Sequence, residues 1–305
     1  IIGRNLEQAA RPSAYGSLEG RFEQEPPVAY EGRQYRRNTA IEAFLLMGVD
    51  QDDAGITVYR SGGQSDFLML VVLNRADKTV RRIMIDRDTM AQITVLGVLG
   101  NDLGTSTLQI CLSHGFGDGR EQSCRYTVEA VQRLLYGIQV DGYYALNLDG
   151  IVPLNDLLGG VTVTLEDDFT AQDPAMAAGT TLMLQGNQAE IFVRSRTSVG
   201  DGTNASRMAR QQAYLSSAME LLVEKIRANA NFIDALFDGL KPYAVTSLSR
   251  GRLLNEVNRA VGYQNLGALT LPGEHRVGNE GFTEFHPDPD ALMRLVLDVF
   301  YLPAD

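Results

Sequence analysis

The sequence is poor in several residue types. Its 305 residues include two cysteines, three histidines and no tryptophan, and only three of its 27 basic residues are lysines. No apolar stretch approaches the ~20 residues that cross a bilayer, and the longest, Phe67–Leu73, has the length of a strand. The net charge of −11 and the pI near 4.8 argue against nucleic-acid binding as the main activity, because such binding usually requires a basic surface.

Several common catalytic motifs are also missing. No serine or cysteine lies in a nucleophile elbow, and no glycine motif of the nucleotide-binding type is present. The three histidines lie in predicted loops without a visible partner, so we assign them no role. Cys111 and Cys124 are too few for a zinc site, and their spacing fits either a disulfide across a glycine loop or two buried free thiols.

The remaining composition is that of a globular protein with a sizeable core, since 44% of the residues are hydrophobic and 8% are aromatic. Strands and helices alternate without a clear linker, which favours a single α/β/α domain over residues 39–305. The polar, charged region over residues 1–38 is predicted to be a stalk that precedes this domain.

Four arginines gather in one segment of this acidic protein. Residues 191–212 contain Arg194, Arg196, Arg207 and Arg210 against a single aspartate, so the segment has a local charge of +3. We expect the first two on a strand, where residues two apart share a face, and the last two on one face of a helix. Guanidinium groups at a strand end and on the first turn of a helix would form a receptor for phosphate or pyrophosphate.

A predicted hairpin brings charged residues together at one edge of a sheet. The polar turn from Asn74 to Thr79 sets a register that places Asp66 opposite Arg87. Asp50 falls at the same edge if its strand runs parallel to the second strand of the hairpin. The three apolar strands of this prediction cover residues 43–49, 67–73 and 80–85.

The rest of the chain is predicted to contain both helices and strands. The long helix has an apolar stripe at helical spacing, and glycines end two of the other helices. Short helices are expected after residue 242, followed by a closing helix. The predicted helices cover residues 106–114, 123–136, 149–158, 206–228 and 290–301, and further strands cover 143–148 and 161–165.

The motifs of the chain resemble, in their order, those of the LytR-CpsA-Psr family of bacterial cell-wall proteins. The resemblance extends over about residues 41–273. The matching strings are SDFLML at 65–70, RDT at 87–89, LLGGV at 157–161, LQGNQA at 184–189 leading into VRSR at 193–196, and RMARQQ at 207–212.

This resemblance implies a three-layer α/β/α sandwich with a central mixed sheet. It also implies an extracellular enzyme, held on the cell membrane by an anchor that would precede residue 1. Such an enzyme moves a wall glycopolymer (teichoic acid or capsular polysaccharide) from a polyprenyl pyrophosphate carrier to peptidoglycan. The lipid tail would lie in an apolar slot between the sheet and the helices. An extracellular location favours the disulfide between Cys111 and Cys124.

The resemblance also implies roles for individual residues. Asp66 and Arg87 would be catalytic, and Asp50 and Asp66 would lie near a Mg²⁺ ion, which binds one or two carboxylates together with phosphate oxygens and water. The expected phosphate ligands are Arg87, Arg194, Arg196, Arg207 and Arg210.

Asp88 is interpreted differently, as a structural residue that caps backbone N–H groups or orients Arg87 by a salt bridge. Two alternatives to the transferase remain open. One is a polyprenyl pyrophosphate phosphatase that uses water as the acceptor. The other is a non-enzymatic protein that binds the lipid carrier, which is suggested by Gln64 at a position where the family often has arginine.

Overall fold

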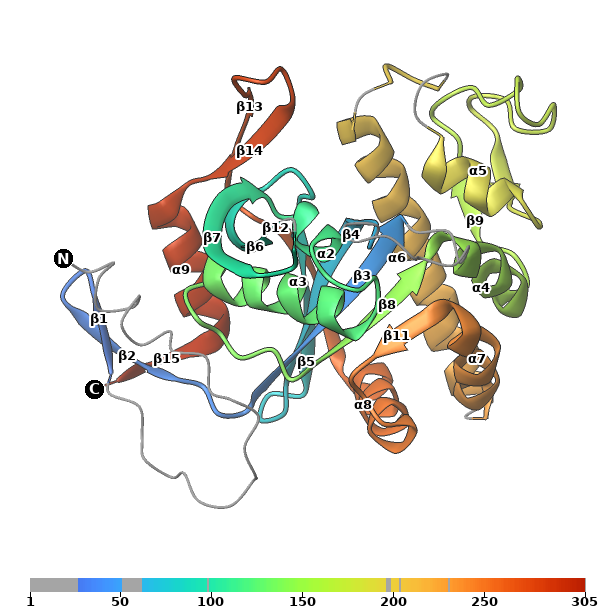
Figure 1. Cartoon of the computed structure of the whole chain (residues 1–305). Coiled ribbons are helices and arrows are strands. Elements are labelled where there is room, and N and C mark those ends of the chain that lie inside the picture. Colours follow the sequence, from blue (N-terminus) through green and yellow to red (C-terminus); the bar gives the residue numbers. More distant parts are fainter. Residues whose placement is uncertain are drawn as a thin grey trace.

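A six-stranded mixed sheet forms the centre of the computed structural model, which describes residues 27–50, 62–97, 99–195, 199–202, 204–229 and 231–304 (Figure 1). The strand order is β11-β8-β3-β4-β5-β12. Only the β8–β3 and β5–β12 pairs are parallel. The bounds are β3 (Ile41–Asp50), β4 (Gln64–Asn74), β5 (Thr79–Ile85), β8 (Gly142–Asn147), β11 (Ala244–Thr246) and β12 (Gln264–Thr270).

The predicted hairpin register is confirmed. Asn74 pairs with Thr79 and Leu68 pairs with Ile85 in the antiparallel β4–β5 ladder. Because β3 and β5 are both antiparallel to β4, they run in the same direction, and β3 ends at Asp50, opposite Gln64. The C-terminal ends of β3 and β5 therefore meet the start of β4 at one edge of the sheet.

Helices cover both faces of this sheet, so the predicted three-layer α/β/α sandwich is confirmed. On one face, α3 (Glu121–Leu134) and α9 (Pro289–Phe300) pack on the core side chains of β3, β4 and β5. On the other face lie α6 (Asn204–Ala228) and α8 (Arg250–Gly262). Leu253 of α8 packs against Phe44 and Leu73, and Leu215 of α6 faces the sheet across a groove.

A second apolar cluster lies beside the sheet and includes the other side of α6. After β8, the turn η1 (Leu148–Gly150) and α4 (Ile151–Leu158) lead to β9 (Thr162–Thr164), which confirms the strand, helix, strand order. However, β9 pairs with β10 (Thr181–Met183) in a separate two-stranded sheet. This cluster also contains α5 (Gln188–Arg194), and α7 (Phe232–Leu240) packs at its edge.

The predicted boundary between stalk and domain is wrong. Residues 1–26 lie outside the described part of the chain, but β1 (Val28–Tyr30) and β2 (Arg33–Arg37) are strands. β2 also pairs with the last strand, β15 (Tyr301–Ala304), and Tyr30 is buried against α9. The folded domain therefore begins before residue 39, because β1 and β2 form one small sheet with β15.

The predicted helix over residues 106–114 is also wrong. β7 (Asp102–Gln109) pairs with β6 (Met90–Leu96), and only the short α2 (Leu112–Gly115) follows. The threonines of this segment favour a strand, and β6 provides the partner. Where short helices are expected after residue 242, α8 is the α-helix that the structure has before the closing helix. It is followed by β12 and by the hairpin of β13 (Gly273–Val277) and β14 (Thr283–Pro287). No helix in the described ranges is both long and apolar enough to cross a membrane.

A cavity in the buried centre of β4 should lower the free energy of unfolding strongly. Leu70 is 0% exposed in the main core, so we expect Leu70→Ala to lower the free energy of unfolding by about 2–5 kcal/mol. Urea unfolding monitored by circular dichroism measures this change. Leu266→Ala is the matched control, because Leu266 is 41% exposed on β12 and should cost much less. Equal losses in the two variants would contradict this account of the core.

Candidate active site

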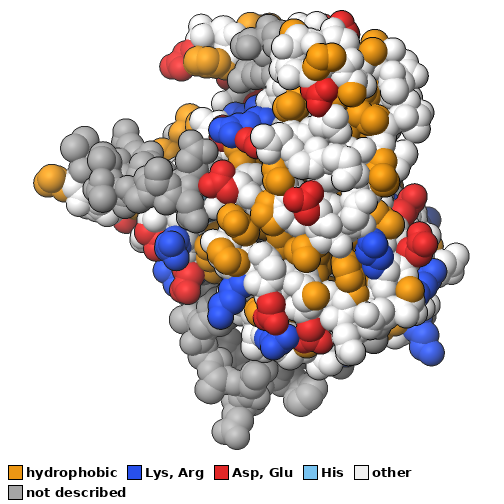
Figure 2. Space-filling model, turned by 90° about the vertical axis from the view of Figure 1, so that its right-hand side faces the viewer, with side chains coloured by type: hydrophobic (Ala, Val, Ile, Leu, Met, Phe, Trp, Pro, Cys, Tyr) orange, Lys and Arg blue, Asp and Glu red, His pale blue; other side chains and the backbone are white. Residues whose placement is uncertain are grey.

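The charged residues on the face that carries α4, α5 and α7 do not form a surface of one sign. Figure 2 shows basic and acidic side chains scattered among apolar and uncharged ones. This face therefore offers an anionic ligand no broad basic patch, and individual buried arginines are the alternative.

Such arginines meet at the sheet edge, around Asp66. Arg87, just beyond β5, forms an ion pair through Nη1 with Oδ1 of Asp66, as the hairpin register predicts. Arg207, on the first turns of α6, places Nη2 3.1 Å from Oδ2 of the same carboxylate. All three side chains are about nine-tenths buried. We call Asp66, Arg87 and Arg207 the Asp66 cluster. It joins the sheet to α6.

Three further groups hold the guanidinium of Arg87. Gln64 Oε1 accepts a hydrogen bond from Nη2, so the residue at the position where the family often has arginine contributes an acceptor. The Sγ atom of Cys111 lies 3.4 Å from the same nitrogen. Asp88 Oδ1 lies 3.3 Å from Nε, which confirms the predicted salt bridge. The contact with Cys111 was missed, because no sequence pattern signals it.

The hairpin of β13 and β14 fixes the segment that carries Arg87. Phe285 N donates to the Asp88 carbonyl at 2.8 Å, and Asp88 Oδ1 also accepts from Gln109 Nε2 at 3.2 Å. His275 Nε2 lies 2.7 Å from Oδ2 of Asp86. A supporting role for Asp88 fits these contacts and stays a prediction.

Arg194 lies on a helix, so the predicted strand over residues 191–196 is wrong. It is the last residue of α5 and donates from Nη1 to Glu190 Oε1 at 2.8 Å, one turn earlier. Its Nη2 lies 3.8 Å from Oδ1 of Asp50, and the side chains of Arg194 and Asp50 are nearly half exposed. Arg196 lies outside the described residues. Asp50 and Arg194 therefore lie close together at the predicted edge, but Arg194 reaches it from a helix and not from a strand.

Arg210 is buried among protein acceptors. Nη1 lies 2.6 Å from Oδ2 of Asp167, Nε donates to the Phe192 carbonyl at 3.2 Å, and Nη2 donates to the Ser195 carbonyl. Its guanidinium also lies over the ring of Phe169, 5.6 Å from the centroid. These contacts tie α6 to the end of α5. A contact between Arg210 and phosphate stays a prediction.

The predicted disulfide between Cys111 and Cys124 is wrong, because both thiols are free and buried. Each thiol faces a different polar partner. Cys111 lies against Arg87, whereas Cys124 Sγ is 3.8 Å from Nε2 of His114. Nδ1 of His114 is in turn 2.5 Å from the Gly62 carbonyl oxygen. Burial raises the pKa of each thiol to about 12 and lowers the pKa of His114.

Few carboxylates lie at this edge, so a cation bound here would take most of its ligands from phosphate and water. Within the described ranges, no three residues of the types His, Cys, Asp and Glu are grouped as a metal site. Asp50 and Asp66 could supply two oxygen ligands, although both oxygens of Asp66 face guanidinium groups. Mg²⁺ accepts one or two carboxylates when phosphate oxygens and water complete its octahedron. The residues present fit such an ion together with a phosphate ligand.

The free thiols lead to a chemical test. We expect iodoacetamide near pH 8 to leave Cys111 and Cys124 unmodified in the folded protein, because burial keeps them protonated, and to modify both in denaturant without reductant. Intact mass reports the number of adducts. An unmodified protein in denaturant would mean that the thiols are joined after all.

The same thiol pKa values predict a loss of stability in alkali. The unfolded thiol ionises near its ordinary pKa of 9.0, whereas the folded thiols ionise at about 12. Between these values the unfolded state binds fewer protons, so the free energy of unfolding should fall as the pH rises through this range. Denaturant titrations at several alkaline pH values measure the fall. Replacing both cysteines by alanine should reduce it.

Comparison with known proteins supports the geometric description. The family model with the description "LytR_cpsA_psr family" matches residues 16–295. Biofilm regulatory protein A of Streptococcus mutans is 28% identical over 188 residues, which cover 59% of this chain and 44% of that protein. The chain thus spans less than half the length of this relative.

A second relative, polyisoprenyl-teichoic acid–peptidoglycan teichoic acid transferase TagU of Bacillus mycoides, is 25% identical over 253 residues, which are 82% of this chain and 74% of that protein. The crystal structure of B. subtilis TagV has the same fold, with a TM-score of 0.64 at 22% identity over 86% of this chain and 96% of that one. Because the family match covers most of its residues, the chain belongs to the LytR_cpsA_psr family.

Proposed function

We propose that this protein is a phosphotransferase that moves a wall glycopolymer, a teichoic acid or capsular polysaccharide, from a polyprenyl pyrophosphate carrier to peptidoglycan. The observation that carries this proposal is the Asp66 cluster, in which two buried arginines from distant parts of the chain converge on one carboxylate. The family match and the printed name of TagU support the same activity.

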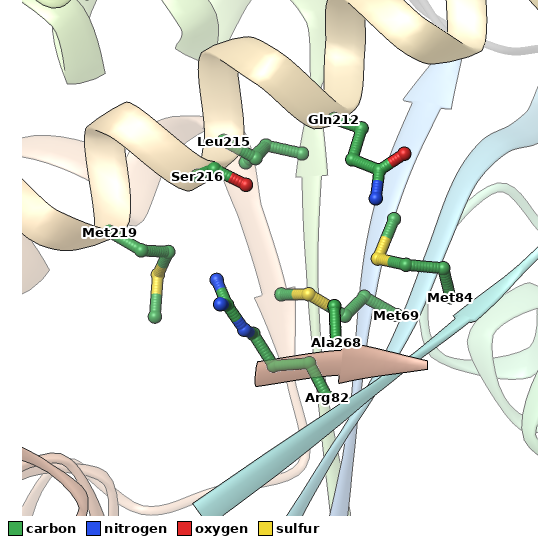
Figure 3. Close-up of a pocket in the computed structure, with 8 residues that line it drawn as sticks. All are labelled: Met69, Arg82, Met84, Gln212, Leu215, Ser216, Met219 and Ala268. Atoms are coloured by element: carbon green, nitrogen blue, oxygen red, sulfur yellow. The ribbon is translucent and has the colours of Figure 1, made fainter. Parts of the chain in front are cut away.

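The groove lies between α6 and the sheet (Figure 3). Its walls belong to the elements that form the cluster, because Met69 follows Asp66 on β4, Met84 precedes Arg87 on β5, and Gln212 follows Arg207 on α6. A lipid phosphate held by the two arginines can therefore extend its tail along the groove. The lining residues are Met69, Arg82, Met84, Gln212, Leu215, Ser216, Met219 and Ala268.

Arg87 and Arg207 would bind the non-bridging oxygens of the pyrophosphate. Guanidinium groups match phosphate with two parallel hydrogen bonds, and such bonds are stronger where water is excluded. Asp66 holds both guanidinium groups at the sheet edge before the substrate arrives, so little reorganisation is needed during the reaction. Asp88 and Gln64 hold Arg87 from its other sides.

In the transfer step, the hydroxyl oxygen of the acceptor sugar forms a bond to the phosphorus nearest the glycopolymer. The bond from that phosphorus to the bridging oxygen breaks, and polyprenyl phosphate leaves with the electron pair. The hydroxyl proton passes to a carboxylate at the sheet edge. Asp50 is the more accessible of the two candidates, because its side chain is nearly half exposed whereas both oxygens of Asp66 are paired.

Asp50 and Asp66 would hold Mg²⁺ together with the phosphate oxygens, and the ion would supply charge neutralisation on the pyrophosphate. The same proposal assigns the protein to the outer face of the cell membrane, where a lipid carrier and peptidoglycan are both within reach. Lipid-linked glycopolymer and peptidoglycan are therefore its proposed partners.

A transfer assay tests the activity directly. Incubation with a lipid-linked wall polymer, peptidoglycan fragments and Mg²⁺ should give a covalent conjugate that mass spectrometry detects. Release of free polymer phosphate in place of a conjugate would instead identify a phosphatase. Binding of the lipid without turnover would identify a carrier-binding protein.

Variants of the Asp66 cluster should separate positioning from stability. Arg87→Ala removes a charge-assisted contact in a buried site and should cost about 2–4 kcal/mol of transition-state stabilisation, measured as kcat/KM for conjugate formation. Asp66→Ala should also remove activity while lipid binding largely persists. Arg87→Lys should rescue only in part, because an ammonium group lacks the bidentate fork.

Asp88→Ala is the matched control for this series. It removes a carboxylate that contacts Arg87 and Gln109, so it should lower the thermal midpoint more than it lowers turnover. A stable but inactive Asp88→Ala variant, together with an active Asp66→Ala variant, would show that the roles of these two aspartates are exchanged.

Removal of divalent cations tests the metal. We expect EDTA to abolish conjugate formation and Mg²⁺ to restore it, because a pyrophosphate in this site needs more positive charge than two already paired arginines provide. Asp50→Asn should raise the Mg²⁺ concentration needed for half-maximal activity. Full activity in EDTA would remove the metal from the proposal.

A further inference from the structure

The β13–β14 hairpin is a projecting element that contacts the segment carrying Arg87. All five residues of β13 are exposed, and Figure 1 shows the hairpin extending away from the central sheet. In β14, Phe285 is buried in the main core. The hairpin attaches to residues 86–89, a turn between β5 and β6 that we call the Arg87 turn. An isolated two-stranded hairpin is at best marginally stable, so its position depends on such contacts.

The carboxylate of Asp86 joins the Arg87 turn to the hairpin. Oδ1 accepts a hydrogen bond from the backbone N–H of Asp88 at 2.8 Å, which shapes the turn. Oδ2 lies 2.7 Å from Nε2 of His275, which is 189 residues away in the chain. Because the side chain of Asp86 is only 11% exposed, its oxygens lose most of their hydration and depend on these partners. A change at His275 is therefore transmitted to the turn through one carboxylate.

Phe285 sets the orientation of the His275 ring. The two residues are paired directly across β13 and β14. Their rings meet edge to face, with the centroids 5.0 Å apart and an angle of 64° between the ring planes. An ionised carboxylate can only accept a hydrogen bond, so Nε2 is the donor to Asp86. The imidazole is thus held against a buried aromatic ring with its N–H directed at the turn.

The contact with His275 supports the first residue of the Arg87 turn. The ladder between β4 and β5 ends at Ile85, one residue before the turn. The later part of the turn is held by backbone hydrogen bonds, among them the bond from Phe285 N to the Asp88 carbonyl at 2.8 Å. At Asp86, between these two supports, the side-chain contact with His275 links the turn to the hairpin.

We propose that His275 is a positioning residue for the transfer reaction, because through Asp86 it fixes the turn that presents Arg87 to the pyrophosphate. His275 acts at a distance and does not touch the substrate. The inference rests on the proposed function, since it requires that Arg87 binds a reacting group. A misplacement of such a group by about 1 Å can lower a rate by ~100-fold. The hairpin is then part of the active site although it contributes no reacting atom.

The kinetics of conjugate formation test the positioning role. His275→Ala should lower kcat/KM by about ten-fold or more, because the Arg87 turn loses its side-chain contact with the hairpin. His275→Gln keeps an N–H donor of similar reach and should restore kcat/KM to within about three-fold of the unmodified protein. Asp86→Ala should cause at least as large a loss as His275→Ala, because both oxygen contacts disappear.

His286→Ala is the matched control on the same hairpin. His286 Nε2 lies 2.8 Å from Oε2 of Glu284, so this variant also removes a pair between a histidine and a carboxylate, but within β14. It should leave kcat/KM unchanged. Equal losses in His275→Ala and His286→Ala would mean that the hairpin serves general stability, and would overturn the positioning role.

A second background separates positioning from stability. In Arg87→Ala the group that His275 positions is absent, so the addition of His275→Ala should cause no further loss of kcat/KM. A merely structural contact would lower activity by the same factor in both backgrounds. Losses that multiply in the double variant would therefore contradict the proposal.

Hydrogen–deuterium exchange, measured by mass spectrometry, examines the turn without turnover. The amides of Asp88 and Thr89 donate within the Arg87 turn, so His275→Ala should raise their exchange rates and His286→Ala should not. Unchanged exchange in His275→Ala would overturn the inference at any level of activity. An unmodified protein that forms no conjugate, with raised exchange in His275→Ala, would refute the proposed function and leave the coupling between hairpin and turn standing.

Discussion

The pairing of one carboxylate, Asp66, with two buried guanidinium groups organises the functional end of this protein. Buried charges lose their hydration and are tolerated only where opposite charges and hydrogen bonds compensate. Asp66 can pair with both Arg87 and Arg207 only if the β4–β5 hairpin keeps its register and α6 crosses this edge of the sheet. The cluster therefore makes the position of the site and the packing of α6 depend on each other.

The first turns of α6 connect two otherwise separate apolar cores. Arg207 contacts the sheet edge, whereas Arg210, one turn later, holds Asp167 and the end of α5. The same α5 end carries Arg194 to within 3.8 Å of Asp50. The second apolar cluster, around α4, α5 and α6, thus forms one wall of the site. The packing of this cluster sets the distance between Arg194 and the sheet.

The groove under α6 has two chemical characters along its length. Three methionines, Leu215 and Ala268 form its apolar lining. Arg82, Gln212 and Ser216 add polar groups to the same lining, and the Nε atom of Arg82 has no hydrogen-bond acceptor among the described residues. A pure hydrocarbon slot would not need this residue.

The sequence alone determined the features that depend on short-range geometry. A six-residue turn set the β4–β5 register, and that register brought Arg87 to Asp66, because strand pairing is fixed once its turn is known. Ordered motifs identified the family, and helical periodicity located α6. The tertiary structure decided the rest. Residues 191–194 form a helix, the cysteines face separate partners, and β2 pairs with β15, since each depends on segments that are distant in sequence. Arg207 reaches Asp66 for the same reason: the contact exists only when α6 packs across the sheet, and no local pattern specifies that packing.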